Sequence, residues 1–120
     1  MNIEDFRDYC LAKRGVTEET PFGDNTLVFK VSGKIFALAE ILEFNSVNLK
    51  CDPAKAVELR ENFEEVQPGY HMNKKHWNTV STKGNLSDIR LQELIDHSYN
   101  LVFDKLTRLQ KLALQEQSEL

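Results

Sequence analysis

The chain has 120 residues, of which 41% are apolar and 28% are charged, and its formal net charge is −4. This composition excludes a disordered or fibrous protein, and the length suits one core, so a second domain is not expected. The negative charge excludes a protein that coats nucleic acid indiscriminately, because such binding depends on neutralising phosphates.

The N-terminal residues, MNIEDFRDYC, are acidic where a signal peptide has basic residues followed by an apolar run. No stretch of the sequence approaches the roughly 20 apolar residues that a membrane span needs. We therefore expect a cytoplasmic protein that makes no membrane contact. Cys10 and Cys51 lack CxxC or zinc-ligand spacing, so both are expected to be reduced and structural.

The first predicted element is a helix over residues 3–14. Asn2 can cap this helix together with Asp5, and Gly15 ends it. The next segment, residues 16–24, mixes acids with Pro21 and is predicted to be a loop or a short extended piece.

Three strands are predicted next, over residues 26–31, 34–40 and 46–51. Leu27, Phe29 and Val31 alternate with Val28 and Lys30 in the first run, and apolar side chains alternate with polar ones in the last. Ser32-Gly33 is the short polar break that a hairpin needs. These strands are expected to form an antiparallel meander.

Asp52 followed by Pro53 predicts a second helix over residues 53–63, because an acceptor at the N-cap precedes a proline whose fixed φ suits the first turn. Residues 78–82 and the KGN turn predict one more strand. Ser87 is the predicted N-cap of a long helix over residues 88–112. The predicted fold class is α+β, with one domain over residues 1–112 and a frayed polar tail over residues 113–120.

The segment GYHMNKKHW, residues 69–77, concentrates chemically versatile side chains around the only tryptophan. His71 and His76 are five positions apart with no third ligand close by, so we expect no metal site and no cofactor. The chain has neither a GxSxG elbow nor a phosphate-binding loop, and it is not expected to be an enzyme. The ring of Trp77 is expected to be largely buried.

Basic residues are unevenly spread, because residues 70–90 contain three lysines and an arginine against Asp88 alone. Lysines beside one aromatic ring resemble a surface for phosphate contact and stacking. The alternative is that these lysines simply solvate the surface.

Several motifs, in their order and spacing, resemble the MmcQ/YjbR family over about residues 2–105. They are Pro21-Phe22-Gly23, Phe29-Lys30-Val31, Gly33-Lys34-Ile35-Phe36-Ala37, Leu49-Lys50-Cys51-Asp52-Pro53, residues 68–77 and Ser98-Tyr99-Asn100-Leu101-Val102. The resemblance implies a CyaY-like fold, in which helices cover one side of a twisted antiparallel sheet and the hairpins form a double wing. It also implies DNA binding, without settled catalytic residues.

The leading hypothesis is a domain that binds nucleic acid weakly through a local basic surface. The candidate residues are Lys30, Lys34, Lys50, Lys74, Lys75, His76 and Lys83. The alternative is a non-enzymatic protein-interaction or small-ligand-binding module in which residues 69–77 are a structural latch. Tyr70 and Met72 are predicted to face the core. Nothing in the sequence separates DNA from RNA or fixes the oligomeric state, although a monomer is favoured.

Overall fold

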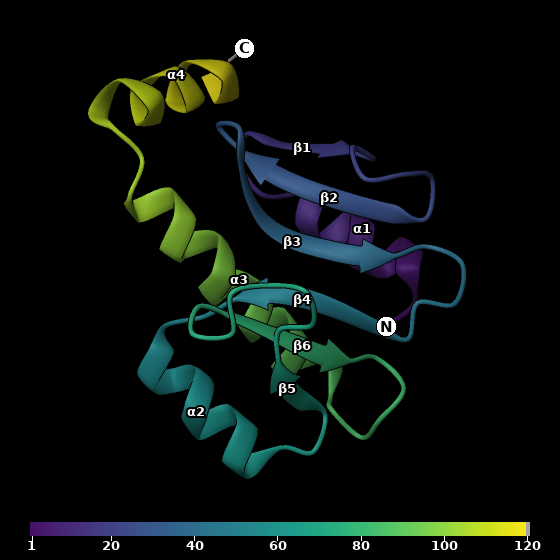
Figure 1. The fold of residues 1–120 in the computed structure, drawn as a ribbon. Coiled ribbons are helices and arrows are strands. Elements are labelled where there is room, and N and C mark those ends of the chain that lie inside the picture. Colours follow the sequence, from purple (N-terminus) through teal and green to yellow (C-terminus); the bar gives the residue numbers. More distant parts are fainter. Residues whose placement is uncertain (120) are drawn as a thin grey trace.

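The computed structural model describes residues 1–119, which form an antiparallel sheet with helices packed on one face (Figure 1). In chain order the elements are α1 (Ile3–Leu11), β1 (Val16–Glu19), β2 (Thr26–Val31), β3 (Lys34–Glu40), β4 (Ser46–Lys50), α2 (Pro53–Asn62), β5 (Val66–Pro68), β6 (Trp77–Ser81), α3 (Asp88–Asp104) and α4 (Arg108–Glu119). The predicted α+β class with an antiparallel sheet is confirmed.

The six described strands lie in the order β1-β2-β3-β4-β6-β5, and every neighbouring pair is antiparallel. The meander of β2, β3 and β4 and the later β6 match the sequence prediction. Two short edge strands complete the sheet: the first lies in the segment predicted to be a loop or a short extended piece, and the second was not predicted. Val16–Glu19 pairs with β2, and Val66–Pro68, which ends in a proline, pairs with β6.

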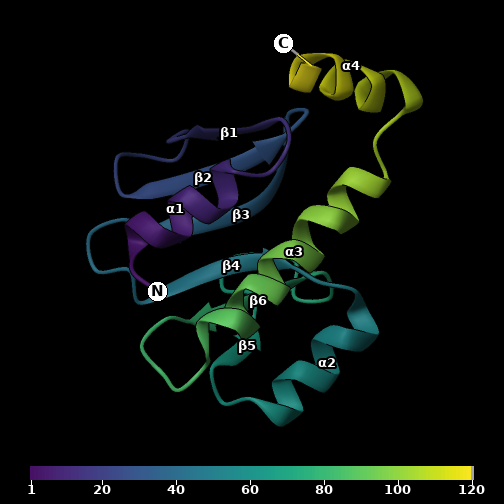
Figure 2. The ribbon, with the colours of Figure 1, turned by 180° about the vertical axis from the view of Figure 1, so that it is seen from behind.

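The core lies on one face of the sheet, where α1 and α3 pack against the strands (Figure 2). Side chains alternate along each strand. In β4, Val47 and Leu49 are buried in this core, so Asn48 and Lys50 point to the opposite face. The largest fully buried core side chains are Phe6, Phe29, Phe36, Leu49 and Ile95. Helix α2 contacts β5 at the edge of the sheet.

Local capping explains where the helices begin. Asn2 and Asp5 form a reciprocal capping box at α1, and Asp52 accepts a hydrogen bond from the Lys55 amide at the start of α2. The Ser87 hydroxyl accepts from the Arg90 amide at 3.1 Å, so the N-cap predicted for the last long helix is confirmed.

The helix predicted over residues 88–112 is two helices. Helix α3 ends at Asp104, and Thr107 precedes the first residue of α4. The Thr107 hydroxyl accepts a hydrogen bond from the Gln110 amide at 3.1 Å, and the Thr107 amide donates one to Gln110 Oε1 at 2.9 Å. This capping box satisfies amides that a continuous helix would bond internally, so the chain turns here. Helix α4 continues to Glu119, past residue 112, and Leu114 is buried. Residue 120, the end of the predicted tail, lies outside the described residues.

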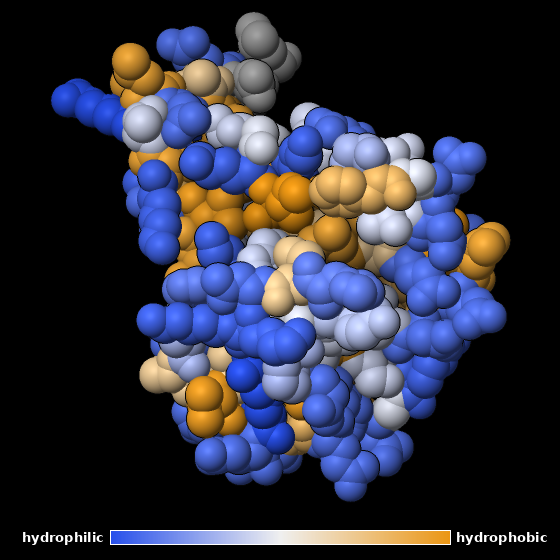
Figure 3. All heavy atoms as spheres, viewed as in Figure 1, coloured by the Kyte–Doolittle hydropathy of each residue, from blue (hydrophilic) through white to orange (hydrophobic). Residues whose placement is uncertain are grey.

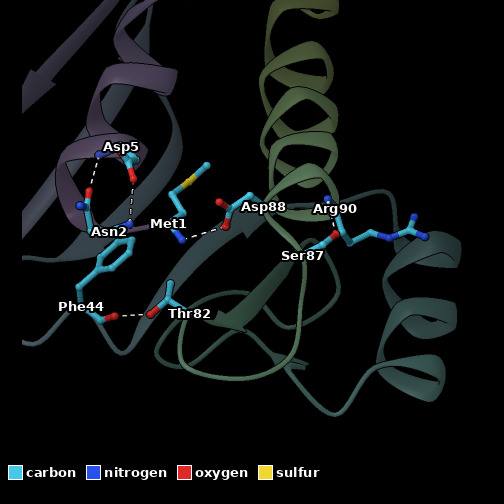
Figure 4. Close-up of polar contacts among 8 residues, drawn as sticks. All are labelled: Met1, Asn2, Asp5, Phe44, Thr82, Ser87, Asp88 and Arg90. Carbon is cyan, nitrogen blue, oxygen red and sulfur yellow. Dashed lines mark hydrogen bonds and ion pairs between the residues drawn. The ribbon is translucent and has the colours of Figure 1, made fainter.

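One end of the sheet is joined by contacts between distant segments (Figure 4). The N-terminal amine lies 2.8 Å from an Asp88 oxygen at the start of α3. The Thr82 hydroxyl, just after β6, donates to the Phe44 carbonyl in the turn between β3 and β4. Lys83 follows Thr82 and therefore lies at this end of the sheet.

Candidate functional site

Residues 69–77 form a closed turn between β5 and β6, which we call the 69–77 turn. The Gly69 amide donates to the Trp77 carbonyl at 2.9 Å, and the Asn73 carbonyl accepts from the His76 and Trp77 amides. The Lys74 ammonium donates to the Gly69 carbonyl at 3.0 Å, so this lysine is used within the turn. The backbone of the turn is therefore held internally at both ends.

Arg60 of α2 fixes the turn to the body of the protein. Its Nε donates to Asn78 Oδ1 at 2.7 Å, and its Nη2 donates to the carbonyls of Lys74 and Trp77. Asn78 is only 2% exposed, so its amide oxygen depends on this donor. Local sequence patterns do not reveal this role of Arg60, because its partners are 14 to 18 positions away.

Of the side chains of the turn, Tyr70 is the one whose direction was predicted wrongly. Tyr70 does not face the core: its side chain is 69% exposed. The strand ends at Pro68. Met72 and Trp77 pack closely against Gly69: a Cβ atom added to this glycine would stand 3.0 Å from the Met72 Cβ and 2.8 Å from the Trp77 Cβ. Met72 and Trp77 are each partly buried, which agrees with the prediction that most of Trp77 is enclosed.

Three lysines from separate elements converge at the end of the sheet where the 69–77 turn lies. Burial lowers the pKa of Lys50 at the end of β4, and repulsion from Lys105 and Lys34 lowers it further. Lys34 begins β3 and Lys105 caps α3. Among residues 1–116, whose side chains are described, none of the three has a carboxylate at ion-pair distance.

The turn adds a fourth lysine to this end of the sheet. Trp77 is the direct partner of Lys50 across β4 and β6, and the Cys51 amide donates to the His76 carbonyl at 2.8 Å. Lys75 lies two residues before Trp77 and is exposed. We call Lys34, Lys50, Lys75 and Lys105 the basic end.

Four predicted site residues, Lys30, Lys74, His76 and Lys83, are not part of the basic end. Lys74 is used within the 69–77 turn, and His76 is partly buried. The Lys30 ammonium lies 2.9 Å from a Glu19 oxygen, so its charge is already compensated. Lys83 follows the far end of β6, whereas Lys50 pairs with its first residue. Lys105 was missed because the sequence predicted an uninterrupted helix there, and only the capping box from Thr107 indicates that the helix ends beside it.

Groups with nucleophilic or acid–base chemistry are withdrawn from solvent to different degrees: Cys10 and Cys51 are buried, and His97 is partly buried. Burial raises the pKa of the Cys51 thiol to about 11 and that of Cys10 to about 12. The Asp52 amide donates to His97 Nε2 at 3.2 Å, while burial and Lys55 lower the pKa of His97. Both cysteines are unpaired, as predicted. The cavity lined by Cys51 and His97 has a volume of about 10 Å³, room for about one water.

The sequence model of the YjbR family matches residues 11–101. The chain belongs to the YjbR family. It is 44% identical over 89 residues to YbdF of Escherichia coli O157:H7, covering 73% of each chain, and 35% identical over 100 residues to YjbR of Escherichia coli K12, covering 82% of this chain and 85% of that one. Both relatives are described as uncharacterized proteins.

Solved structures of similar proteins share the fold of this YjbR-family chain. The crystal structure of Deinococcus radiodurans protein DR2400, described with domain DUF419, has a TM-score of 0.88 at 37% identity, covering 95% of this chain and 88% of that one. A crystal structure from Pseudomonas syringae has a TM-score of 0.71 at 30% identity, covering 84% and 98%. The predicted family is confirmed, whereas CyaY likeness and a double wing stay predictions.

Residues 1–119 contain neither a membrane-spanning helix nor a metal-binding cluster of side chains. No helix in this part of the chain has the length and apolar character needed to cross a bilayer. Nor do three or more His, Cys, Asp or Glu side chains come close enough together there to hold a metal ion.

Proposed function

We propose that this protein binds nucleic acid weakly, through phosphate contacts made by the basic end. One observation supports the proposal: Lys34, Lys50 and Lys105 converge from three elements without a compensating carboxylate among the described side chains. Like charges held together repel one another, and a polyanion removes that repulsion. Lysines at such a site neutralise phosphates and release counterions.

The charge of the whole chain limits the affinity. With a formal charge of −4, the rest of the surface repels a polyanion, so contact is restricted to the basic end. Phosphate contacts position a protein without reading bases, so binding should depend little on sequence. A dissociation constant between about 10⁻⁴ and 10⁻⁶ M, the range of ordinary non-specific association, is expected.

Fluorescence of Trp77 provides the test, because this is the only tryptophan and it lies across from Lys50. Titration with a mixed-sequence duplex at low salt should change this fluorescence. Lys105→Gln should weaken the binding, and Lys83→Gln is the matched control, since both lysines are exposed but Lys83 is at the other end of the sheet. Equal effects of the two substitutions, or no binding up to millimolar duplex, would refute the proposal.

The alternative is a protein-interaction module in which the contacts of Arg60 make the 69–77 turn a structural latch. These contacts give the 69–77 turn a structural role that needs no ligand. A small-ligand site gains no comparable support from the cavity beside Cys51, because about 10 Å³ does not admit an organic ligand. If nucleic acid fails to bind, the protein-interaction proposal takes its place.

A further inference from the structure

Tyr70 and His71 form an exposed pair of rings on the 69–77 turn. Their ring centroids are 4.0 Å apart with an interplanar angle of 51°, and both side chains are exposed. Tyrosine usually buries its ring, because the ring contributes a large apolar area. Here the ring is held in solvent by a turn whose backbone is fixed through Arg60, Lys74 and Asn73.

The ring pair lies beside the basic end, on the sheet face opposite the core. The Tyr70 amide donates to Thr79 Oγ1 at 2.9 Å, and that hydroxyl donates to Asn48 Oδ1 at 2.5 Å. Asn48 precedes Lys50 by two residues in β4, so both side chains point to this same face. Figure 1 shows the turn in front of β4, on the side away from α1 and α3.

The surface around the pair is polar. Figure 3, drawn from the same side, shows mostly hydrophilic residues over β4 and β6, whereas hydrophobic ones gather nearer to α4. The open-face residues of these two strands are Ser46, Asn48, Lys50, Trp77, Thr79 and Ser81. Two exposed rings within a polar, lysine-bearing face match a partner that offers both flat rings and negative charge.

Resting on the proposed function, we propose that Tyr70 and His71 stack against the bases of a single-stranded nucleic acid whose phosphates contact the basic end. In a duplex the base faces are covered by neighbouring pairs, whereas a single strand presents them to aromatic side chains. Base stacking tolerates any sequence because every base has a flat face. The ring pair therefore adds a preference for single strands to a surface whose lysines attract any polyanion.

The test compares a labelled single-stranded oligothymidine of about 12 nucleotides, within the usual site size, with a duplex of equal length by fluorescence anisotropy. Tyr70→Ala should weaken single-strand binding by at least about fivefold, the lower end of what one stacked base contributes, and leave duplex binding unchanged. Tyr70→Phe should retain it. Phe22→Ala is the matched control, because Phe22 is 65% exposed on a different loop.

The outcomes separate this inference from the proposed function. If the wild-type protein binds the duplex and loses that binding in Lys105→Gln, but Tyr70→Ala changes single-strand binding no more than Phe22→Ala does, stacking is refuted and the phosphate contacts stand. If the wild-type protein binds neither probe, both proposals fail. Circular dichroism of each variant confirms folding, which is expected because both replaced side chains are exposed.

Discussion

Arg60 is the residue on which the 69–77 turn depends. Replacing it by methionine keeps an apolar stem but removes the donors to Asn78 and to the Trp77 carbonyl. An unpaired buried acceptor costs about 1–3 kcal/mol, so Arg60→Met should lower the free energy of unfolding by that amount. Urea denaturation measures the change.

Arg90 offers the matched control for this experiment. Its guanidinium forms an exposed ion pair with Glu93 at 3.0 Å, and exposed pairs contribute less than about 1 kcal/mol. A loss in Arg90→Met as large as that in Arg60→Met would contradict a specific role for the buried contacts.

The charge of Lys50 is expected to lower the stability of the fold, and the proposed phosphate contact gives a reason for a lysine at this position. Burial and the charges of Lys105 and Lys34 disfavour its ammonium in the folded state, so Lys50→Gln should raise the urea midpoint of unfolding at neutral pH. The same substitution should weaken duplex binding. A variant that is less stable than the wild type would show that this lysine stabilises the fold.

His97 should make stability depend on pH. It accepts a hydrogen bond from the Asp52 amide and must be neutral to do so. Because its pKa is lowered in the folded state, the unfolded chain takes up the proton first, at about pH 6.5. Stability should therefore fall as the pH drops below that value and should be unaffected by this group above it.

The comparison for His97 is His97→Gln, which keeps an acceptor but does not titrate. Urea midpoints measured at pH 7.5 and pH 5 should differ more in the wild-type protein than in this variant. Equal pH dependence in the two proteins would assign the effect to other groups.

At the scale of the element, α4 is joined to the N-terminal half through Gly15. A Cβ on Gly15 would stand 2.2 Å from Leu114 Cδ2, and Gly15 has φ +72°. Gly33 has a similar φ of +77°, and a Cβ added there would have no neighbour within 4 Å. Gly33→Ala therefore measures only the cost of placing a non-glycine residue in the left-handed backbone conformation, about 1–2 kcal/mol. Gly15→Ala should cost more than Gly33→Ala.

A double variant tests the reason for that difference. Combining Gly15→Ala with Leu114→Ala removes the collision between the two side chains. The double variant should therefore lose less unfolding free energy than the sum of the losses measured for the two single variants. Additive losses would show that α4 does not depend on this contact.

The sequence predicts some elements better than others for a physical reason. Helices α1 and α2 carry their own capping residues, β4 carries alternating side chains, and β2 and β3 flank the polar Ser32-Gly33 break, so local sequence suffices for these elements. The edge strands β1 and β5 are three or four residues long and form through the neighbour that each pairs with. The apolar spacing through Leu106 and Leu109 favoured a continuous helix, but Leu109 is exposed and the chain turns between them.

The candidate site was predictable only in part. Lys34, Lys50 and Lys75 were identified from strand ends and from a lysine-rich turn, which are local features. The approach of Lys105 to Lys50, the pairing of Lys30 with Glu19, and the outward direction of Tyr70 follow from tertiary packing. Periodicity cannot supply such information, because it describes one element at a time.

For the whole molecule, the basic end predicts how binding depends on salt. Four lysines contacting phosphates of a duplex give a slope of log affinity against log salt between about −3 and −4. The double variant Lys50→Gln/Lys105→Gln should flatten this slope by about two units, whereas Lys83→Gln should leave it unchanged. Titrations at several salt concentrations measure the slope, and an unaltered slope in the double variant would place the contacts elsewhere.

Helix α3 closes the core but is synthesised after all six described strands. The Ser98 hydroxyl donates to the Phe36 carbonyl at 2.5 Å and accepts from the Lys50 amide at 2.8 Å, and the Tyr99 hydroxyl donates to the Arg14 carbonyl across 85 positions of sequence. A nascent chain on the ribosome cannot make these contacts until α3 has emerged. Until then the part of the apolar face that α3 covers, Phe36 included, is open to water, and such transiently exposed apolar surface makes a growing chain prone to aggregation.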